Sequence, residues 1–153
     1  MRLTEQTRYA VRVLAACAQV HPEVVAVKKV AADTGLTEFT IFKLLKTATR
    51  AGLVASVRGR NGGIRLARPA NEITLVDVVT VTEENFAMAE CFDGGVTDCP
   101  LVFQCELNAA LRQALDAFLS TLGRFSIADL VENRPFMSQT LGIPMAPEHA
   151  ALS

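Results

Sequence analysis

The spacing of apolar and polar positions predicts a helical protein that begins with an amphipathic helix. Near the start of the chain apolar side chains recur at the three- and four-residue spacing of one helix face. That predicted face consists of Tyr9, Ala10, Val13, Leu14, Cys17 and Ala18. Thr4 is placed to cap the helix, and the His21-Pro22 pair ends it because proline has no backbone N–H. Cys17 is expected to be a small buried hydrophobe.

Residues 27–50 predict two short helices joined by a tight turn. The first has an apolar face of Val27, Val30 and Ala31. Gly35 suits a left-handed turn, and Thr37 can cap the second helix. The inward positions of that helix are Ile41, Leu44, Leu45 and Ala48, and its outward positions are Thr40, Lys43, Lys46, Thr47 and Arg50. This is the pattern of a helix-turn-helix, although two short helices also pack this way without a ligand.

A strand, a glycine-rich turn and a second strand follow directly. Asn61-Gly62 is a hairpin signal. The arginines of the hairpin are Arg58, Arg60, Arg65 and Arg68. A helix-turn-helix followed by such a hairpin predicts a winged helix, whose second helix enters the major groove while the wing contacts the DNA backbone or minor groove. We therefore expect a double-stranded DNA operator, contacted by Thr37, Thr40, Lys43, Lys46, Arg58 and Arg60.

The second half of the chain predicts further helices around a loop. Thr74 and Asp77 have the spacing of a capping box and would open a helix, although the β-branched residues that follow also allow a strand. Weak periodicity predicts a loop over residues 83–104. Ser126 and Asp129 would cap a short last helix.

A long apolar helix between the loop and the last helix predicts a homodimer. Its stripe consists of Leu107, Leu111, Leu115, Phe118 and Leu122, widened by Ala110, Ala114 and Leu119. The helix is apolar on too many sides for one small domain to cover, so we expect it to pack against its counterpart in a second chain. Burial within the monomer is the alternative.

The expected fold class is therefore mainly α, a winged helix-turn-helix domain with a two-stranded wing plus a long dimerisation helix. We expect a DNA-binding domain at residues 1–82, a cysteine-containing loop at 83–106, the dimerisation helix and a short helix at 107–134, and a flexible tail at 135–153.

The net charge of −1 conceals a strong asymmetry along the 153 residues. Residues 1–70 carry twelve Lys and Arg against four Asp and Glu, a net charge of +8, whereas residues 71–153 carry three against twelve, a net charge of −9. Phosphate attraction is a local effect, screened beyond about 8 Å at physiological salt. The separation therefore favours a nucleic-acid-facing first half, with chance clustering on solvated faces as the alternative.

Composition argues against several other classes. With 50% hydrophobic and 20% charged residues, disorder across the body of the chain is not expected. No apolar run approaches the roughly 18 residues that cross a bilayer, and the start of the chain lacks the apolar core of a signal peptide. Four cysteines in such a chain favour a reducing, cytoplasmic compartment. Neither His belongs to a nucleophile–base grouping, so we expect no enzyme.

Cys91, Cys99 and Cys105 have seven and five residues between them and lie in the predicted loop. A structural zinc site usually offers close cysteine pairs and a fourth Cys or His, which this spacing lacks. An iron–sulfur cluster needs thiolates that converge, and a loop with wide spacing permits this. A reversible disulfide between two of the three needs no third cysteine. Spacing alone leaves the cluster and the thiol switch equally open, with zinc behind them.

Several of these segments resemble one known family over residues 1 to about 135. The resemblance rests on MRLTEQTRYAVRVL, the helix-turn-helix, VRGRNGGIRLARP, DVVTVTE and the run from ENFAMAECF through Cys105. These are similar to the winged-helix iron–sulfur regulators of the IscR, NsrR and RirA type, and closest to the rhizobial iron regulator RirA.

The resemblance implies a homodimeric, cytoplasmic DNA-binding protein that holds an iron–sulfur cluster through three cysteines per subunit, here Cys91, Cys99 and Cys105. A 4Fe-4S cluster is favoured over a 2Fe-2S cluster. RirA-like members repress iron-uptake genes when iron is plentiful, so the implied function is an iron-responsive, cluster-dependent repressor. The alternative is a nitric-oxide or redox-sensing repressor, with or without a cluster.

The chain departs from this family at several positions. Asn108 stands where the assembly regulators have a ligand His, and Arg8 stands where nitric-oxide sensors supply a ligand Asp. Water, a small thiol or a carboxylate such as Glu90 would then complete the cluster. Phe42 replaces a base-contacting Glu of some members, so the resemblance implies no operator sequence, whereas Arg58 matches the family's wing arginine.

Overall fold

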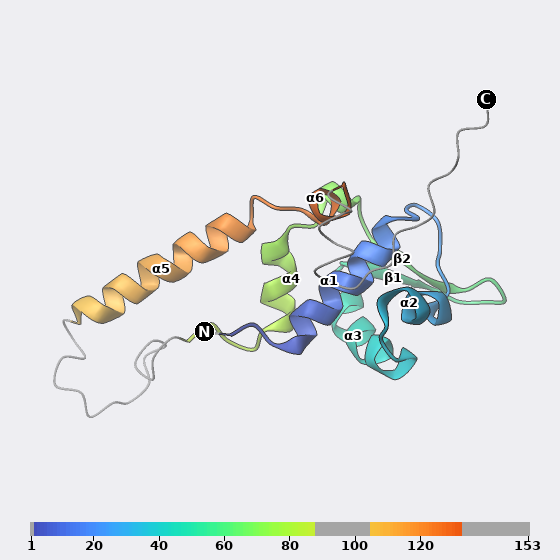
Figure 1. The fold of residues 1–153 in the computed structure, drawn as a ribbon, viewed down its shortest axis with the longest axis horizontal. Helices are drawn as coiled ribbons and strands as arrows, with labels where there is room; N and C mark the ends of the chain where they lie inside the picture. Colours follow the sequence, from blue (N-terminus) through green and yellow to red (C-terminus); the bar gives the residue numbers. More distant parts are fainter. Residues whose placement is uncertain (1, 88–104, 133–153) are drawn as a thin grey trace.

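A central helix, α1 (Glu5–Ala18), organises the computed structural model, which describes residues 2–87 and 105–132 (Figure 1). The elements packed against it are α2 (Val27–Thr34), α3 (Glu38–Arg50), α4 (Leu75–Thr82), α6 (Ile127–Glu132) and strand β2 (Gly63–Leu66). Its predicted apolar face is buried at Ala10, Val13, Leu14 and Cys17. The mainly helical fold class predicted from the sequence is confirmed.

The helix-turn-helix forms as its local chemistry predicts. Gly35 ends α2 with a left-handed backbone at φ 70°, a conformation in which a side chain would be strained. The Thr37 hydroxyl accepts a hydrogen bond from the Thr40 backbone N–H at 3.2 Å and so caps α3. The side chains that α3 buries in the core are Ile41, Leu44 and Leu45. The opposite face of α3 is left to solvent.

The wing is a two-stranded antiparallel sheet of β1 (Val54–Val57) and β2, paired from Val54 with Leu66 to Val57 with Gly63. Val25, which lies just before α2, extends this sheet by one bridge. Its N–H donates to the Ile64 carbonyl and its carbonyl accepts from the Ile64 N–H, both at 2.8 Å. A Cβ atom at Gly63 would collide with the Val25 carbonyl oxygen, so this approach requires glycine. The wing is thereby attached to the helix-turn-helix.

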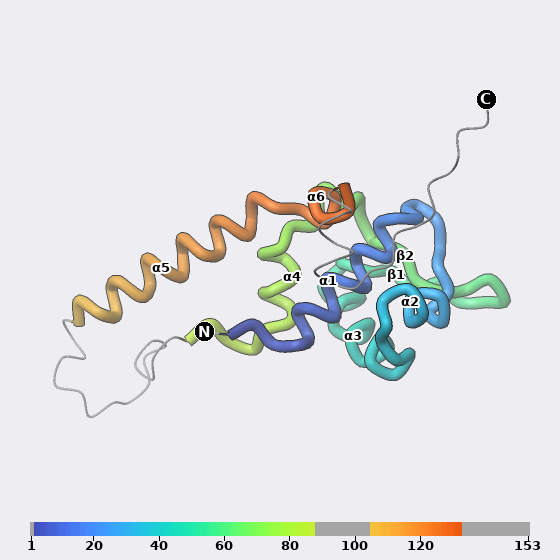
Figure 2. Tube along the Cα trace, viewed as in Figure 1, coloured from blue at the N-terminus to red at the C-terminus, as the bar shows by residue number. Residues whose placement is uncertain are grey.

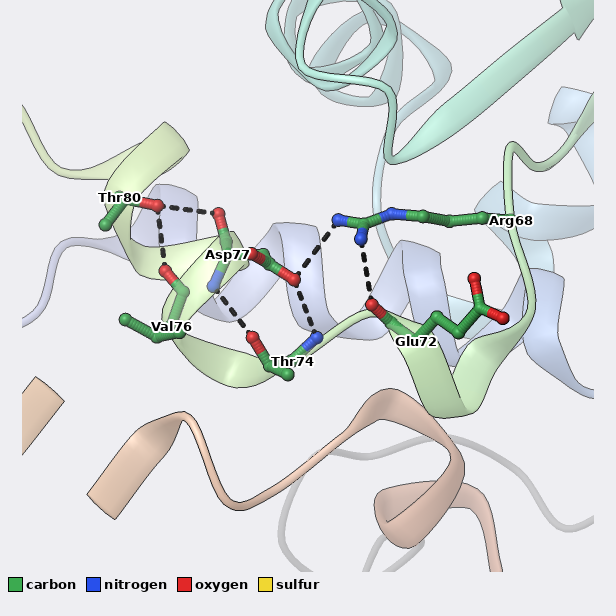
Figure 3. Close-up of polar contacts among 6 residues, drawn as sticks. All are labelled: Arg68, Glu72, Thr74, Val76, Asp77 and Thr80. Carbon is green, nitrogen blue, oxygen red and sulfur yellow. Dashed lines mark hydrogen bonds and ion pairs between the residues drawn. The ribbon is translucent and has the colours of Figure 1, made fainter. Parts of the chain in front are cut away.

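After a short 3-10 helix, η1 (Ala70–Glu72), a capping box opens α4. The Thr74 hydroxyl accepts from the Asp77 N–H and the Asp77 carboxylate accepts from the Thr74 N–H, as the sequence predicted. The chain is helical here rather than a strand. Arg68 lies beside this box, where it donates to Asp77 at 3.1 Å and to the Glu72 carbonyl at 2.9 Å (Figure 3).

These contacts determine the ionisation of Asp77. Desolvation raises its pKa, but the Thr74 hydrogen bonds and the Arg68 guanidinium together outweigh that effect and hold the pKa below its ordinary value. Arg68 therefore stabilises the start of α4, although the sequence had grouped it with the wing arginines.

Helix α6 returns to the N-terminal part of the fold. Ser126 and Asp129 cap it reciprocally, as predicted: the Ser126 N–H donates to the Asp129 carboxylate at 2.6 Å, and the Asp129 N–H donates to the Ser126 hydroxyl at 3.2 Å. Two backbone bonds of 2.8 Å, from Leu75 to Phe125 and from Ile127 to Ile73, join its start to that of α4. Helix α6 packs on α1, so this part of the chain after residue 107 contacts the DNA-binding domain. The predicted domain boundary at residue 107 stays a prediction.

Helix α5 (Glu106–Leu122) extends away from the rest of the described chain and contacts α4 (Figures 1 and 2). None of its residues is buried, and Leu107 is 65% exposed. The described residues of the same chain therefore cover its apolar stripe only in part. Packing of this helix against a second chain and its burial within the monomer therefore both stay predictions.

Candidate nucleic-acid interface

An open groove of about 910 Å³ lies between α3 and the wing. Its ionisable lining residues are Lys28, Lys46, Arg50 and Arg58, with Glu38 as the acidic member. The remaining lining includes Phe42 of α3 and the backbone of the wing glycines. Four cations against one anion favour a polyanion in this groove.

The predicted contact residues of α3 all belong to its solvent-facing side. The Thr37 and Thr40 hydroxyls lie 2.9 Å apart near the start of the helix, where they are partly used for capping. Lys43 and Lys46 are exposed, and Lys46 lines the groove together with Arg58. The fold thus brings residues from α3 and the wing to one surface, and their contacts with DNA stay a prediction.

The wing presents Arg58 and Arg60 in its exposed turn. Gly59 between them has φ 114°, a backbone conformation that strains any other residue. Arg58 faces the groove, whereas Arg60 is not among its lining residues. Arg58 therefore shares the groove with Lys46 of α3, whereas a DNA contact by Arg60 stays a prediction.

Two aromatic residues of this surface, Phe39 and Phe42, were not among the predicted DNA contacts. Phe39 is 73% exposed and Phe42 is 56% exposed on the solvent-facing side of α3. The Lys43 ammonium lies 5.9 Å from the centroid of the Phe39 ring, a cation–π distance. The available signal in the sequence was that both phenylalanines stand among the predicted outward positions of this helix, next to Thr40 and Lys43.

Of the three predicted cluster ligands, the structure describes one, Cys105. Cys105 is half-buried at the N-cap position of α5, where its side chain makes no capping hydrogen bond. Cys91 and Cys99 lie outside the described residues. Within residues 2–87 and 105–132, no group of three His, Cys, Asp or Glu side chains could hold a metal ion. Cys17 is fully buried in α1, and this burial raises the pKa of its thiol to about 12, so it serves the core.

Glu83 connects the end of α4 to the start of α1. Its carboxylate accepts hydrogen bonds from the Thr4 backbone N–H at 2.9 Å, from the Thr4 hydroxyl at 3.1 Å and from the Thr7 hydroxyl. Desolvation raises the pKa of Glu83, but these bonds, led by that of Thr7, lower it below its ordinary value. The sequence predicted that Thr4 caps α1. Its side chain instead bonds to Glu83 and makes no capping hydrogen bond to α1.

Arg8 and Asn108, which replace the two ligands that family members have at these positions, each contact a residue on the same helix. Arg8 forms an ion pair with Glu5 one turn earlier, at 3.5 Å. The Asn108 side chain accepts a hydrogen bond from Arg112 at 2.9 Å.

A helix-turn-helix and a basic groove closed on one side by a two-stranded wing define a winged-helix DNA-binding protein. The chain belongs to the Rrf2 family, described as iron-dependent transcriptional regulators, whose family model matches residues 3–133. It is therefore a DNA-binding transcriptional regulator. The expectation that the chain is not an enzyme agrees with relatives that are named as regulators.

Relatives of this chain match it over nearly its whole length. Protein aau3 of Rhizobium meliloti is 54% identical over 153 residues, which cover 99% of each chain. The HTH-type transcriptional regulator NsrR of Geobacillus kaustophilus is 39% identical over 142 residues, which cover 92% of this chain and 97% of that protein.

Solved structures share the fold. IscR of T. potens superimposes with a TM-score of 0.68 at 24% identity and covers 88% of both chains. CymR of B. subtilis, titled the global cysteine regulator, superimposes with a TM-score of 0.68 at 25% identity and covers 87% of this chain and 98% of that one. In the described part of the present chain, no helix has the length and hydropathy of a membrane span.

Proposed function

We propose that this regulator is an iron-responsive repressor of iron-uptake genes whose DNA binding depends on an iron–sulfur cluster. It acts in the cytoplasm as a homodimer on a double-stranded operator. Cys91, Cys99 and Cys105 hold the cluster, with 4Fe-4S favoured. The observation that carries this proposal is the position of Cys105, a half-buried thiol directly before helix α5.

The cysteines suit this group chemically. Thiolates are the usual ligands of iron–sulfur clusters, and Cys105 forms no disulfide within the described residues. When bound, the cluster supplies an iron-dependent link between three thiolates. The chain's own residues connect that link to the DNA-binding domain, because Glu83 is hydrogen-bonded to the start of α1 while Cys105 directly precedes α5.

The DNA contacts of this proposal come from α3 and the wing. Lys43 and Lys46 of α3 approach the major groove together with Thr37 and Thr40, and Arg58 and Arg60 contact phosphates or the minor groove. The charge of +8 on residues 1–70 supports this docking.

The dimer forms through α5. Leu107 of its stripe is exposed, and the described residues bury Phe118 and the other leucines only in part, so a second copy would cover the apolar surface that remains. Two copies joined in this way present two recognition helices, as paired operator half-sites require.

A direct test begins with protein purified without oxygen. We expect bound iron and acid-labile sulfide, and duplexes selected from a random DNA pool should bind tightly. Cys105→Ala should lose both the iron and the DNA binding. Cys17→Ala is the matched control because its thiol is buried in α1, and it should keep both. Iron-free protein that binds DNA at full strength would contradict the proposal.

A metal-free thiol switch is the second candidate, favoured by a Cys105 thiol that forms no disulfide within the described residues. In that case the oxidised protein contains a disulfide between two of the three cysteines, and the anaerobic protein contains neither iron nor sulfide. The same iron and sulfide assay therefore separates the two candidates.

A further inference from the structure

Helix α3 carries a second apolar feature that its core packing does not use. Phe39 and Phe42 are three residues apart and therefore neighbours on one helix face. At about 100° per residue, their sector also contains Lys43 and Lys46 and lies opposite Ile41. The two rings are 73% and 56% exposed, so neither contributes its full surface to folding.

The charges around the rings indicate what covers them. Lys43 lies over Phe39, and Phe42 lines the groove that also contains Lys46 and Arg58. A second protein chain would have to desolvate these cations to reach the rings. The surface needs a partner that pairs with the cations and also covers the rings. DNA can do both, because its phosphates pair with the cations while its base edges reach the rings.

The major groove offers one apolar group on its base edges, the 5-methyl group of thymine. Helix α3 is the element expected to enter that groove, and its first turns contain both phenylalanines. We propose that Phe39 and Phe42 contact thymine methyl groups, so that each operator half-site carries thymine at the positions that the two rings meet. This inference rests on the proposed docking of α3 in the major groove.

The test uses duplexes selected by the wild-type protein from a random DNA pool. Thymines shared by the selected sequences are replaced one at a time by deoxyuridine, which lacks the methyl group and keeps the same base pairing. Because one buried methyl group corresponds to about a fourfold change in affinity, wild-type binding should weaken by about fourfold at each contacted thymine.

The ring variants identify which phenylalanine meets which methyl group. Phe42→Ala and Phe39→Ala should bind more weakly to the thymine duplex, and each should lose the thymine–uracil difference at its own position. Phe125→Ala is the matched control, because Phe125 is 48% exposed but lies outside α3, and it should retain the full difference. Circular dichroism confirms that each variant is folded.

Lys46→Ala separates the inference from the docking on which it rests. This variant should bind both duplexes more weakly by the same factor, since it removes a cation and no methyl contact. If Lys46→Ala weakens binding while wild-type protein binds thymine and uracil duplexes equally, α3 docks but the methyl contact is refuted. The methyl contact is also refuted if Phe42→Ala and Phe39→Ala each lose as much affinity for the uracil duplex as for the thymine duplex. If neither Lys46→Ala nor the ring variants change binding, the docking itself is refuted.

Discussion

The Glu83 carboxylate accepts a hydrogen bond from the Thr4 backbone N–H at 2.9 Å, although the two residues are 79 positions apart in sequence. Glu83 directly follows α4, and Thr4 directly precedes α1. A carboxylate at this position satisfies an N–H that the helix leaves unpaired and interacts favourably with the helix dipole. The chain leading toward Cys91 is thereby attached to the central helix of the DNA-binding domain.

Glu83→Gln should destabilise the protein at neutral pH by about 1 kcal/mol, the order of a lost capping interaction. The pKa of Glu83 lies below its ordinary value of 4.5, so its stabilising effect is present above that value and is lost as the pH falls through the folded-state pKa. Urea unfolding of wild type and variant should therefore differ at neutral pH and converge in acid. The neighbouring Glu84 is exposed, and Glu84→Gln should have no effect. A constant difference at both pH values would contradict this account.

Arg58 and Arg68 both belong to the wing segment in sequence, but replacing Arg58 should affect DNA binding and replacing Arg68 should affect stability. Arg58→Ala should weaken DNA binding and reduce the slope of log affinity against log salt by about one, because it removes one phosphate contact. Arg68→Ala should leave that slope unchanged and lower the free energy of unfolding by about 1 kcal/mol, since Arg68 is bonded to Asp77 and Glu72. Fluorescence anisotropy across a salt series and urea unfolding make the comparison. Equal salt slopes for Arg58→Ala and wild type would exclude Arg58 as a contact.

Gly63→Ala should detach the wing from the helix-turn-helix. The added Cβ collides with the Val25 carbonyl, so we expect a loss of about 2 kcal/mol or more in unfolding free energy and weaker DNA binding. Gly123→Ala is the control, because its Cβ would make ordinary contacts at 3.5 Å and its backbone is already helical. That variant should be as stable as wild type or slightly more stable. Equal stability of the two variants would show that the Val25 approach adjusts freely.

Leu115→Asp should convert the proposed dimer into a monomer. Its carboxylate would have to be buried against the partner's stripe, which costs far more than the dimer contact at one position provides. Gln113→Asp places the same charge on the other side of α5 and should remain dimeric. Light scattering after size-exclusion chromatography measures both masses, and a dimeric Leu115→Asp variant would place the dimer contact elsewhere.

Local chemistry explains why so much of the fold was predictable. Gly35, Thr37 and the Thr74–Asp77 box act within a few residues of themselves, so their sequence spacing determines their structure. The Val25–Ile64 bridge is a tertiary contact between residues distant in sequence, and no local pattern reveals it.

The surface was predicted less completely for a related reason. Arg68 and Arg58 look alike in sequence, and only the tertiary position of Asp77 shows that Arg68 is structural. Phe39 and Phe42 were left out of the predicted contacts because apolar residues usually mark the buried face of a helix, whereas here both rings are exposed.

In the proposed function, iron occupancy at the cysteines controls DNA binding by α3 and the wing. The most direct measurement is the affinity of the anaerobically purified full-length protein for one selected duplex, before iron removal by a chelator, after it, and after iron and sulfide are restored. We predict that affinity falls by at least about tenfold on iron removal, a coupling of about 1.4 kcal/mol, and recovers on restoration. An affinity that stays the same through all three states would contradict the claim.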